Sequence, residues 1–167
     1  MLAFTPMKRI LFLVDRNNLG RQAENEFGTF RLTENGDPFN TIFTVNRLKS
    51  SNIPIDSNVV ISTIQRLFSL LKGEEITDNE GDDEDIEDED VEDEDVELPE
   101  NPNLPSDFFD MIIIDECHRS IYGNWQKVLN YFSKAKLIGL TATPVPETKA
   151  FFNNNIIVNY TLEKSIV

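Results

Sequence analysis

The stretch FDMIIIDECHRS, residues Phe109 to Ser120, decides the fold of this chain. Four apolar residues, Met111 to Ile114, run directly into Asp115 and Glu116. A short apolar run that stops abruptly at charged residues is typical of a buried strand in a parallel sheet. The two carboxylates then follow the carboxyl end of the strand, where open α/β sheets bind their ligands. The stretch therefore predicts an acidic pair placed for chemistry, with a solvated acidic turn as the alternative.

Adjacent acids at a strand end have a definite chemical use. Asp115 is suited to hold Mg²⁺, usually through water, because this ion prefers oxygen ligands and keeps several of its own waters. Glu116 is suited to polarise an attacking water. Cys117 and His118 continue the motif, but one cysteine and one histidine cannot make a zinc site.

Other apolar runs repeat the pattern of a strand, a polar turn and a helix about four times, which favours an α/β fold with a parallel sheet and covering helices. The expected strands are Ile10–Val14, Val59–Ile61, Met111–Ile114 and the segment KLIGLTATP, residues 136–144. The expected helices are residues 18–27, a stripe from Ile64 to Leu71 and a second stripe from Trp125 to Phe132. Weaker signals predict strands at Thr29–Leu32, Ile42–Val45 and Ile156–Tyr160, and a helix at Thr148–Phe152.

Composition bounds the class of protein. At 167 residues the chain is long enough for one domain with a real core, and it has no apolar stretch long enough to span a membrane. Its single cysteine, Cys117, excludes an internal disulfide and suits a reducing cytoplasm. We therefore expect a cytoplasmic protein without a membrane partner.

The net charge of −15 comes from one tract. Residues Glu74 to Glu100 hold 18 of the 30 acidic residues and no basic one, so the rest of the chain has 12 acids against 15 Lys and Arg. That remainder is mildly basic, which is compatible with a nucleic-acid partner. The tract predicts a disordered acidic insertion, residues 74–106, between an N-terminal part (1–73) and a C-terminal part (107–167) of one domain. A solvated loop, a DNA mimic and a partner-binding tail remain open readings.

Two short motifs, each on the end of an apolar strand, resemble motifs II and III of superfamily 2 helicases and translocases. They are DECH at residues 115–118 and TATP at residues 141–144. LVDRNNLGRQ resembles the motif Ia region and ISTIQRL the motif Ib region. Three longer segments are similar to the restriction (motor) subunit of type I restriction–modification enzymes. They are GDPFNTIFTVNRLKSS, IIIDECHRSIYGNWQKVLNYF and PETKAFFNNNIIVNYTLEKSIV. The resemblance covers nearly the whole chain outside the acidic tract and implies a RecA-like fold.

The resemblance also implies roles for individual residues. Asp115 would help to coordinate the Mg²⁺ of ATP, Glu116 would activate the attacking water, and His118 would relay the nucleotide state. Thr141 and Thr143 would couple hydrolysis to movement. Residues on the DNA face would grip phosphates without reading bases; they are Arg16, Gln22, Thr63 and Gln65. A structural role for His118 and a surface ion pair for Arg16 remain alternatives.

The sequence departs from the family at the phosphate-binding loop. Such NTPases need a GxxxxGK[ST] loop, and no Gly-Lys pair occurs here. We therefore expect a fragment of the first RecA-like domain that lacks the Walker A strand and loop, and that is inactive alone.

The expected function is part of an ATP-dependent motor of a type I restriction endonuclease. The parent enzyme would translocate double-stranded DNA together with modification and specificity subunits, and a separate nuclease domain would cut the DNA. Another superfamily 2 helicase, such as a type III restriction subunit, is one alternative. A truncated, catalytically inactive binding module is the other.

Overall fold

A five-stranded parallel sheet forms the centre of the chain in a computed structural model that describes residues 5–33, 36–76, 98–119 and 123–159. The strands are β1 (Ile10–Val14), β2 (Val45–Arg47), β3 (Val59–Thr63), β4 (Met111–Ile114) and β5 (Lys136–Gly139). Their order in the sheet is β2-β3-β1-β4-β5, and every described pairing is parallel. In the described residues β5 is therefore an edge strand.

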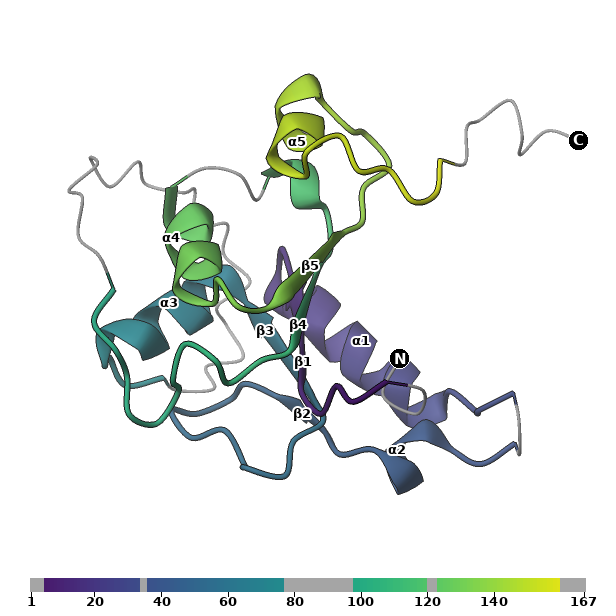
Figure 1. Cartoon of the computed structure of the whole chain (residues 1–167). Helices are drawn as coiled ribbons and strands as arrows, with labels where there is room; N and C mark the ends of the chain where they lie inside the picture. Colours follow the sequence, from purple (N-terminus) through teal and green to yellow (C-terminus); the bar gives the residue numbers. More distant parts are fainter. Residues whose placement is uncertain (1–4, 34–35, 77–97, 120–122, 160–167) are drawn as a thin grey trace, which may run out of the picture.

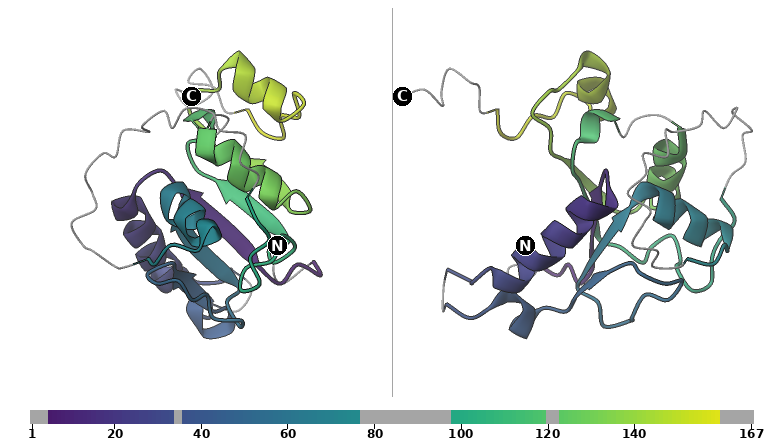
Figure 2. Two further views of the ribbon diagram at one scale, coloured as in Figure 1. Left: turned by 90° about the vertical axis from the view of Figure 1, so that its left-hand side faces the viewer. Right: turned by 180° about the vertical axis from the view of Figure 1, so that it is seen from behind.

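Helices cover both faces of this sheet (Figure 1). They are α1 (Asn17–Thr29), α2 (Phe39–Ile42), α3 (Ile64–Lys72), α4 (Gly123–Tyr131) and α5 (Pro146–Phe151), with a 3₁₀ helix η1 (Cys117–Arg119). α3 and α4 lie on one face and α1 on the other, as both views of Figure 2 also show. α5 lies beyond the carboxyl end of β5, above η1 in Figure 1.

The central strands are apolar on both sides because both sides are covered. All five residues of β3 are buried, and β1 pairs with it in the register Ile10 to Val59. On the side of α3 and α4, Leu11 and Ile112 are fully buried and pack with Phe132 in one core. This core holds β1 and β4 in place against the helices, and it therefore fixes the position of the residues that follow these two strands.

Local signals define α3. The Thr63 side chain accepts a hydrogen bond from the Arg66 amide at 3.4 Å, which caps the first turn. Gly73 ends the helix with φ of 81°, a left-handed conformation that glycine adopts without steric cost. Ile64 and Leu67 are fully buried in the predicted apolar stripe. The predicted strand and helix at residues 59–71 are confirmed.

The RecA-like α/β class is confirmed by the parallel sheet and its flanking helices. Some weaker predictions are wrong. Residues Thr29–Leu32 form no strand, because α1 continues to Thr29 and only Arg31 makes an isolated bridge, to Pro38. Residues Phe39–Ile42 are helical, so the strand predicted at 42–45 begins only at Val45. β5 ends at Gly139, five residues before the predicted end.

The tail also differs from expectation. α5 begins at Pro146, two residues earlier than predicted, since proline suits the first turn of a helix. Residues 156–159 contain no strand, and the rest of the strand predicted at Ile156–Tyr160 lies outside the described residues.

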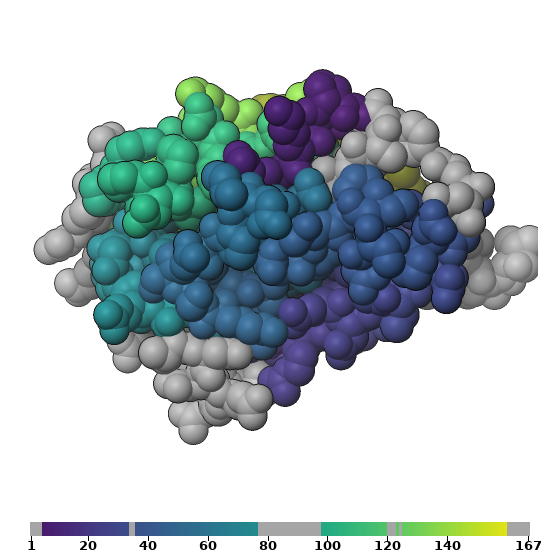
Figure 3. Space-filling model, turned by 90° about the horizontal axis from the view of Figure 1, so that it is seen from below, coloured from purple at the N-terminus to yellow at the C-terminus, as the bar shows by residue number. Residues whose placement is uncertain are grey.

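The amino edge of the sheet carries the flanks of the acidic tract. α3 runs back from the carboxyl edge to this side, and residues 98–109 lead from it into β4. Figure 3 views the molecule from this side, where the blue segment before β3 lies beside the green segment before β4. Leu104, in this segment, is only 1% exposed and packs in the core. Residues 77–97, which hold most of the tract, lie outside the described residues.

In the described residues no helix is both long and apolar enough to cross a membrane.

Candidate functional site

The carboxyl edge of the sheet gathers the polar side chains predicted from the sequence. Because every described strand pair is parallel, residues that follow different strands emerge on the same edge. Asp15 follows β1, Asp115 follows β4, and Thr141 comes two residues after β5. This edge is the upper one in Figure 1. The acidic pair and the threonine motif therefore face one region of space, as the sequence indicates.

The acidic pair lies in a tight turn between β4 and η1 (Cys117–Arg119). The Asp115 amide donates to the Leu13 carbonyl at 2.9 Å, and the Glu116 amide donates to Asp115 Oδ1 at 3.1 Å. Glu116 has φ of 48°, in the left-handed region that non-glycine residues seldom occupy. Such backbone strain gathers at functional sites. The Glu116 side chain is 43% exposed, so solvent can reach its carboxylate.

His118 joins the turn after β4 to the segment after β5. Its Nδ1 lies 3.0 Å from Thr141 Oγ1 and 3.3 Å from Glu116 Oε2. The Thr143 amide donates to the same Thr141 hydroxyl oxygen at 3.1 Å. Acid, imidazole and hydroxyl therefore form one chain of polar contacts, in which the tautomer of His118 sets the direction of each hydrogen bond. The structure brings together four of the predicted site residues here: Glu116, His118, Thr141 and Thr143.

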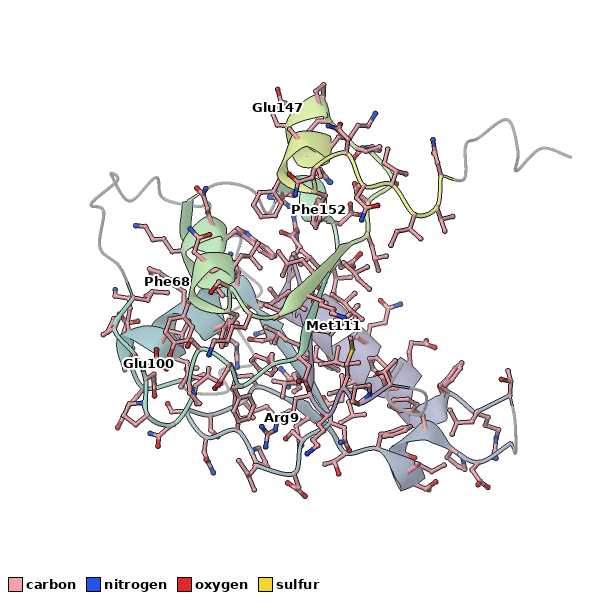
Figure 4. All side chains as sticks on the ribbon, in the orientation of Figure 1. Arg9, Phe68, Glu100, Met111, Glu147 and Phe152 are labelled. Atoms are coloured by element: carbon pink, nitrogen blue, oxygen red, sulfur yellow. The ribbon has the colours of Figure 1, made fainter. Side chains whose placement is uncertain are left out.

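Cys117 is buried in the turn and holds it against the segment that follows β5. It is 2% exposed, its amide donates to the Leu140 carbonyl at 3.0 Å, and burial raises the pKa of its thiol. A Cβ on Gly139 would lie only 2.6 Å from Cys117 Sγ and 2.7 Å from Cζ of Phe152. Phe152 lies under α5 in Figure 4. Cys117 is thus a packed spacer between η1, β5 and the α5 region, and its neutral thiol is a poor nucleophile.

A second polar group lies beside the acidic turn. Arg119 Nη1 lies 2.5 Å from Asp15 Oδ2, and Arg16 Nε lies 3.7 Å from the same oxygen. The Asp15 side chain is 17% exposed, whereas the two arginine side chains are about half exposed. The ion pair left open for Arg16 on the sequence is therefore present, and Arg16 is also accessible to a ligand.

The other predicted DNA-contact residues differ in how they are placed. Gln22, on α1, lines a cavity of about 470 Å³ together with Asp115. The cavity walls are mainly aromatic and aliphatic, formed by Phe12, Val14, Leu19, Ala23, Phe27, Phe30 and Phe39. Gln65 is half-buried in the first turn of α3. Thr63 is only 7% exposed and its hydroxyl caps α3. Its side chain therefore stabilises the first turn of the helix that carries Gln65 and is poorly placed to contact a phosphate.

The donor set fits Mg²⁺ only when the ion brings its own ligands. In residues 5–33, 36–76, 98–119 and 123–159 no three His, Cys, Asp or Glu side chains come together as a metal site. Asp115 still offers a hard carboxylate oxygen at the sheet edge, and Mg²⁺ typically takes one or two carboxylates plus waters and phosphate oxygens. Asp115 is therefore compatible with Mg²⁺ that is bound along with a nucleotide.

Three residues that shape the site were not singled out on the sequence. Asp15 directly follows a strand, as Asp115 does, and that position was its signal. Arg119 carried no local signal, because its partner lies 104 positions away. Gly139 is required by the close approach of Phe152, which no sequence pattern indicates.

Residues 2–146 match the family described as "Type III restriction enzyme, res subunit". The chain belongs to this family. Among curated proteins, this family member is 36% identical over 140 residues to the type I restriction enzyme EcoAI endonuclease subunit of Escherichia coli. That match covers 82% of this chain and 13% of the relative.

Two further relatives carry the same kind of name. The type I restriction enzyme EcoKI endonuclease subunit of Escherichia coli (strain K12) is 29% identical over 180 residues, covering 96% of this chain and 13% of the relative. The SauMSSORF170P endonuclease subunit of Staphylococcus aureus (strain MSSA476) is 29% identical over 139 residues, covering 83% of this chain and 12% of the relative. The resemblance to type I restriction subunits is confirmed, and the chain spans 12–13% of these relatives' length.

Proposed function

We propose that this chain is part of the ATP-dependent motor of a type I restriction endonuclease and belongs to its first RecA-like domain. One observation carries the proposal. The contacts of His118 with Glu116 and Thr141, at 3.3 and 3.0 Å, join the acidic turn after β4 to the segment after β5. A connection between two strand ends is what a motor needs in order to pass a change at the nucleotide to a moving part.

The acidic pair has two roles in this proposal. Bound Mg–ATP supplies the phosphoryl group and the charge neutralisation that phosphoryl transfer requires. Asp115 would offer a carboxylate oxygen to hold this ion. Glu116, exposed in a turn that fixes its backbone, orients a water and accepts its proton.

The rim of the same edge provides the DNA contacts. Arg16 is half exposed, and Gln22 is exposed on α1 near Asp115. Guanidinium and amide donors hold phosphates of any sequence, as a motor moving along double-stranded DNA requires. Gln65 adds a third donor, and Thr63 contributes by capping the helix that carries it.

The names of the relatives support the wider assignment. A type I restriction endonuclease subunit works on DNA, and we propose that this chain acts in the cytoplasm with modification and specificity subunits and a separate nuclease domain. Because the chain spans 12–13% of those relatives, these partners belong to the whole protein.

The test compares Glu116→Gln with Asp115→Asn in a subunit that carries the complete motor. Glu116→Gln is expected to keep ATP binding and to abolish turnover, because an amide fills the site without accepting a proton. Asp115→Asn is expected to weaken Mg–ATP binding, because the ion loses a charged ligand. Glu100→Gln, far from the site at the left of Figure 4, is the matched control. Wild-type hydrolysis rates in both variants would refute the assignment.

A binding module without hydrolysis is the second candidate, since no Gly-Lys pair provides a phosphate loop in this sequence. Under the first proposal the 167-residue chain alone releases no phosphate from ATP, while the complete motor does. A complete subunit that binds DNA without hydrolysing ATP would favour the binding module.

A further inference from the structure

Asp15 connects two segments that the proposed motor uses for different purposes. Its Oδ2 lies 2.5 Å from Nη1 of Arg119 and 3.7 Å from Nε of Arg16. Arg16 belongs to the proposed DNA rim, whereas Arg119 ends η1, directly after the acidic turn. One carboxylate oxygen is thus shared by two cations, Arg16 next to Asp15 in the sequence and Arg119, which lies 104 positions after Asp15.

Arg119 is coupled to the acidic turn through the backbone. Its amide donates to the Glu116 carbonyl at 3.0 Å, and His118 is its neighbour in η1. The turn between them is short and strained, with Glu116 at φ of 48°. A change in the strength of the ion pair between Asp15 and Arg119 is therefore transmitted to Glu116, which would orient water, and to His118, which contacts Thr141.

The ion pair is not explained by stability alone. Both arginine side chains are about half exposed, and exposed ion pairs contribute little to folding because water screens them. A phosphate beside Arg16 would draw its guanidinium away from Asp15. The carboxylate would then interact with Arg119 alone, and the tie to η1 would strengthen because its competing cation is gone.

We propose that Asp15 is a positioning residue through which DNA contact at Arg16 sets the position of the acidic turn and stimulates ATP hydrolysis. The inference rests on the proposed motor function and adds to it a route from the DNA rim to Glu116. Asp15 touches neither the nucleotide nor the DNA in this scheme. It acts through the charge that it shares between two arginines.

The test measures ATP hydrolysis by the complete subunit with and without double-stranded DNA. Asp15→Asn and Arg119→Gln are each expected to lower the ratio of the two rates by at least about fivefold, the lower end of usual allosteric coupling. The double variant is expected to lose no more than either single variant, because both remove the same link. Arg119→Lys keeps the charge and is expected to retain most of the stimulation.

Asp107→Asn is the matched control. Asp107 pairs with Lys134 at 3.6 Å, both side chains are exposed, and both precede strands at the opposite edge of the sheet. This variant is expected to keep the wild-type ratio. Thermal unfolding of each variant provides the readout for a merely structural role, which would lower stability and leave the stimulation ratio of the folded enzyme unchanged.

The outcomes separate the two levels of the proposal. A wild-type subunit without DNA-stimulated hydrolysis would overturn the motor function and this inference with it. Normal stimulation in the wild type and in both single variants would overturn the inference alone. Losses that multiply in the double variant would also overturn it, since Asp15 and Arg119 would then act independently.

Discussion

Replacing Gly139 with alanine tests how tightly the acidic turn is packed against β5. A Cβ at this position would lie 2.6 Å from Cys117 Sγ and 2.7 Å from Cζ of Phe152. Carbon atoms in favourable contact are about 3.5–4.0 Å apart, so both neighbours must move. Overpacking of this kind costs about 1–3 kcal/mol of unfolding free energy. For a chain of this size each kcal/mol corresponds to about 2–4 °C, which predicts a fall in Tm of about 2–12 °C.

Gly28→Ala is the matched control for this substitution. A Cβ on Gly28 meets only Asn40 Nδ2, at 3.9 Å, and the residue lies in α1. Alanine there is expected to raise stability by about 0.5–1 kcal/mol, because it removes the entropy cost of a helical glycine. Urea and thermal unfolding of the 167-residue chain, followed by circular dichroism, measure both variants.

The variant Phe152→Ala tests whether the cost of Gly139→Ala comes from packing against the Phe152 ring. In that background Gly139→Ala is expected to cost less, because one of the two clashing side chains is gone and contacting residues are not additive. A Gly139→Ala chain as stable as the wild type would refute the packing described here. An equal cost with and without the Phe152 ring would refute the part assigned to that ring.

DNA contact, the acidic tract and the buried thiol can each be tested separately. Arg16→Ala is expected to weaken DNA binding about equally on all sequences and to lower the salt slope by roughly one phosphate contact, measured by salt titration; an unchanged slope would place the contact elsewhere. Replacing residues 77–97 with a short Gly/Ser linker is expected to leave ATP hydrolysis by a complete subunit largely unchanged, and loss of folding would show that the tract is structural. Cys117 is expected to react slowly with iodoacetamide until the chain unfolds, because burial shields the thiol and raises its pKa above the ordinary value. Because the folded pKa is raised, the contribution of this group to stability is fully present below the ordinary thiol pKa and is lost as pH rises through the folded pKa.

Much of the fold follows from apolar runs. Ile10–Val14 and Met111–Ile114 were predicted with their observed bounds, because strands buried on both faces need continuous apolar sequence and stop where the chain meets solvent. The parallel arrangement followed from alternation of strands with helices. The shared edge of Asp115 and Thr141 was then a geometric consequence, and the sequence could place the site before its contacts were known.

Tertiary packing decided what the sequence could not. Thr29–Leu32 and Ile42–Val45 look like strands locally. The Phe39 ring, however, packs against the rings of Phe27 and Phe43, with centroid distances of 5.3 and 4.9 Å, in an aromatic cluster that favours the short helix α2. Such contacts override local propensity. The pair of Asp15 with Arg119 was equally out of reach, because only the finished sheet brings β1 and η1 together.

The position of β5 at the border of the described sheet has a consequence for the behaviour of the chain in solution. An edge strand presents unpaired amide and carbonyl groups, and these are a template for pairing with another molecule. Ile138 is only half-buried and Leu140 is 46% exposed beside that border. The net charge of −15 opposes such self-association, because identical molecules repel each other. Salt reduces the range of that repulsion to about 8 Å at physiological ionic strength. The acidic residues therefore oppose self-association most strongly in dilute buffer.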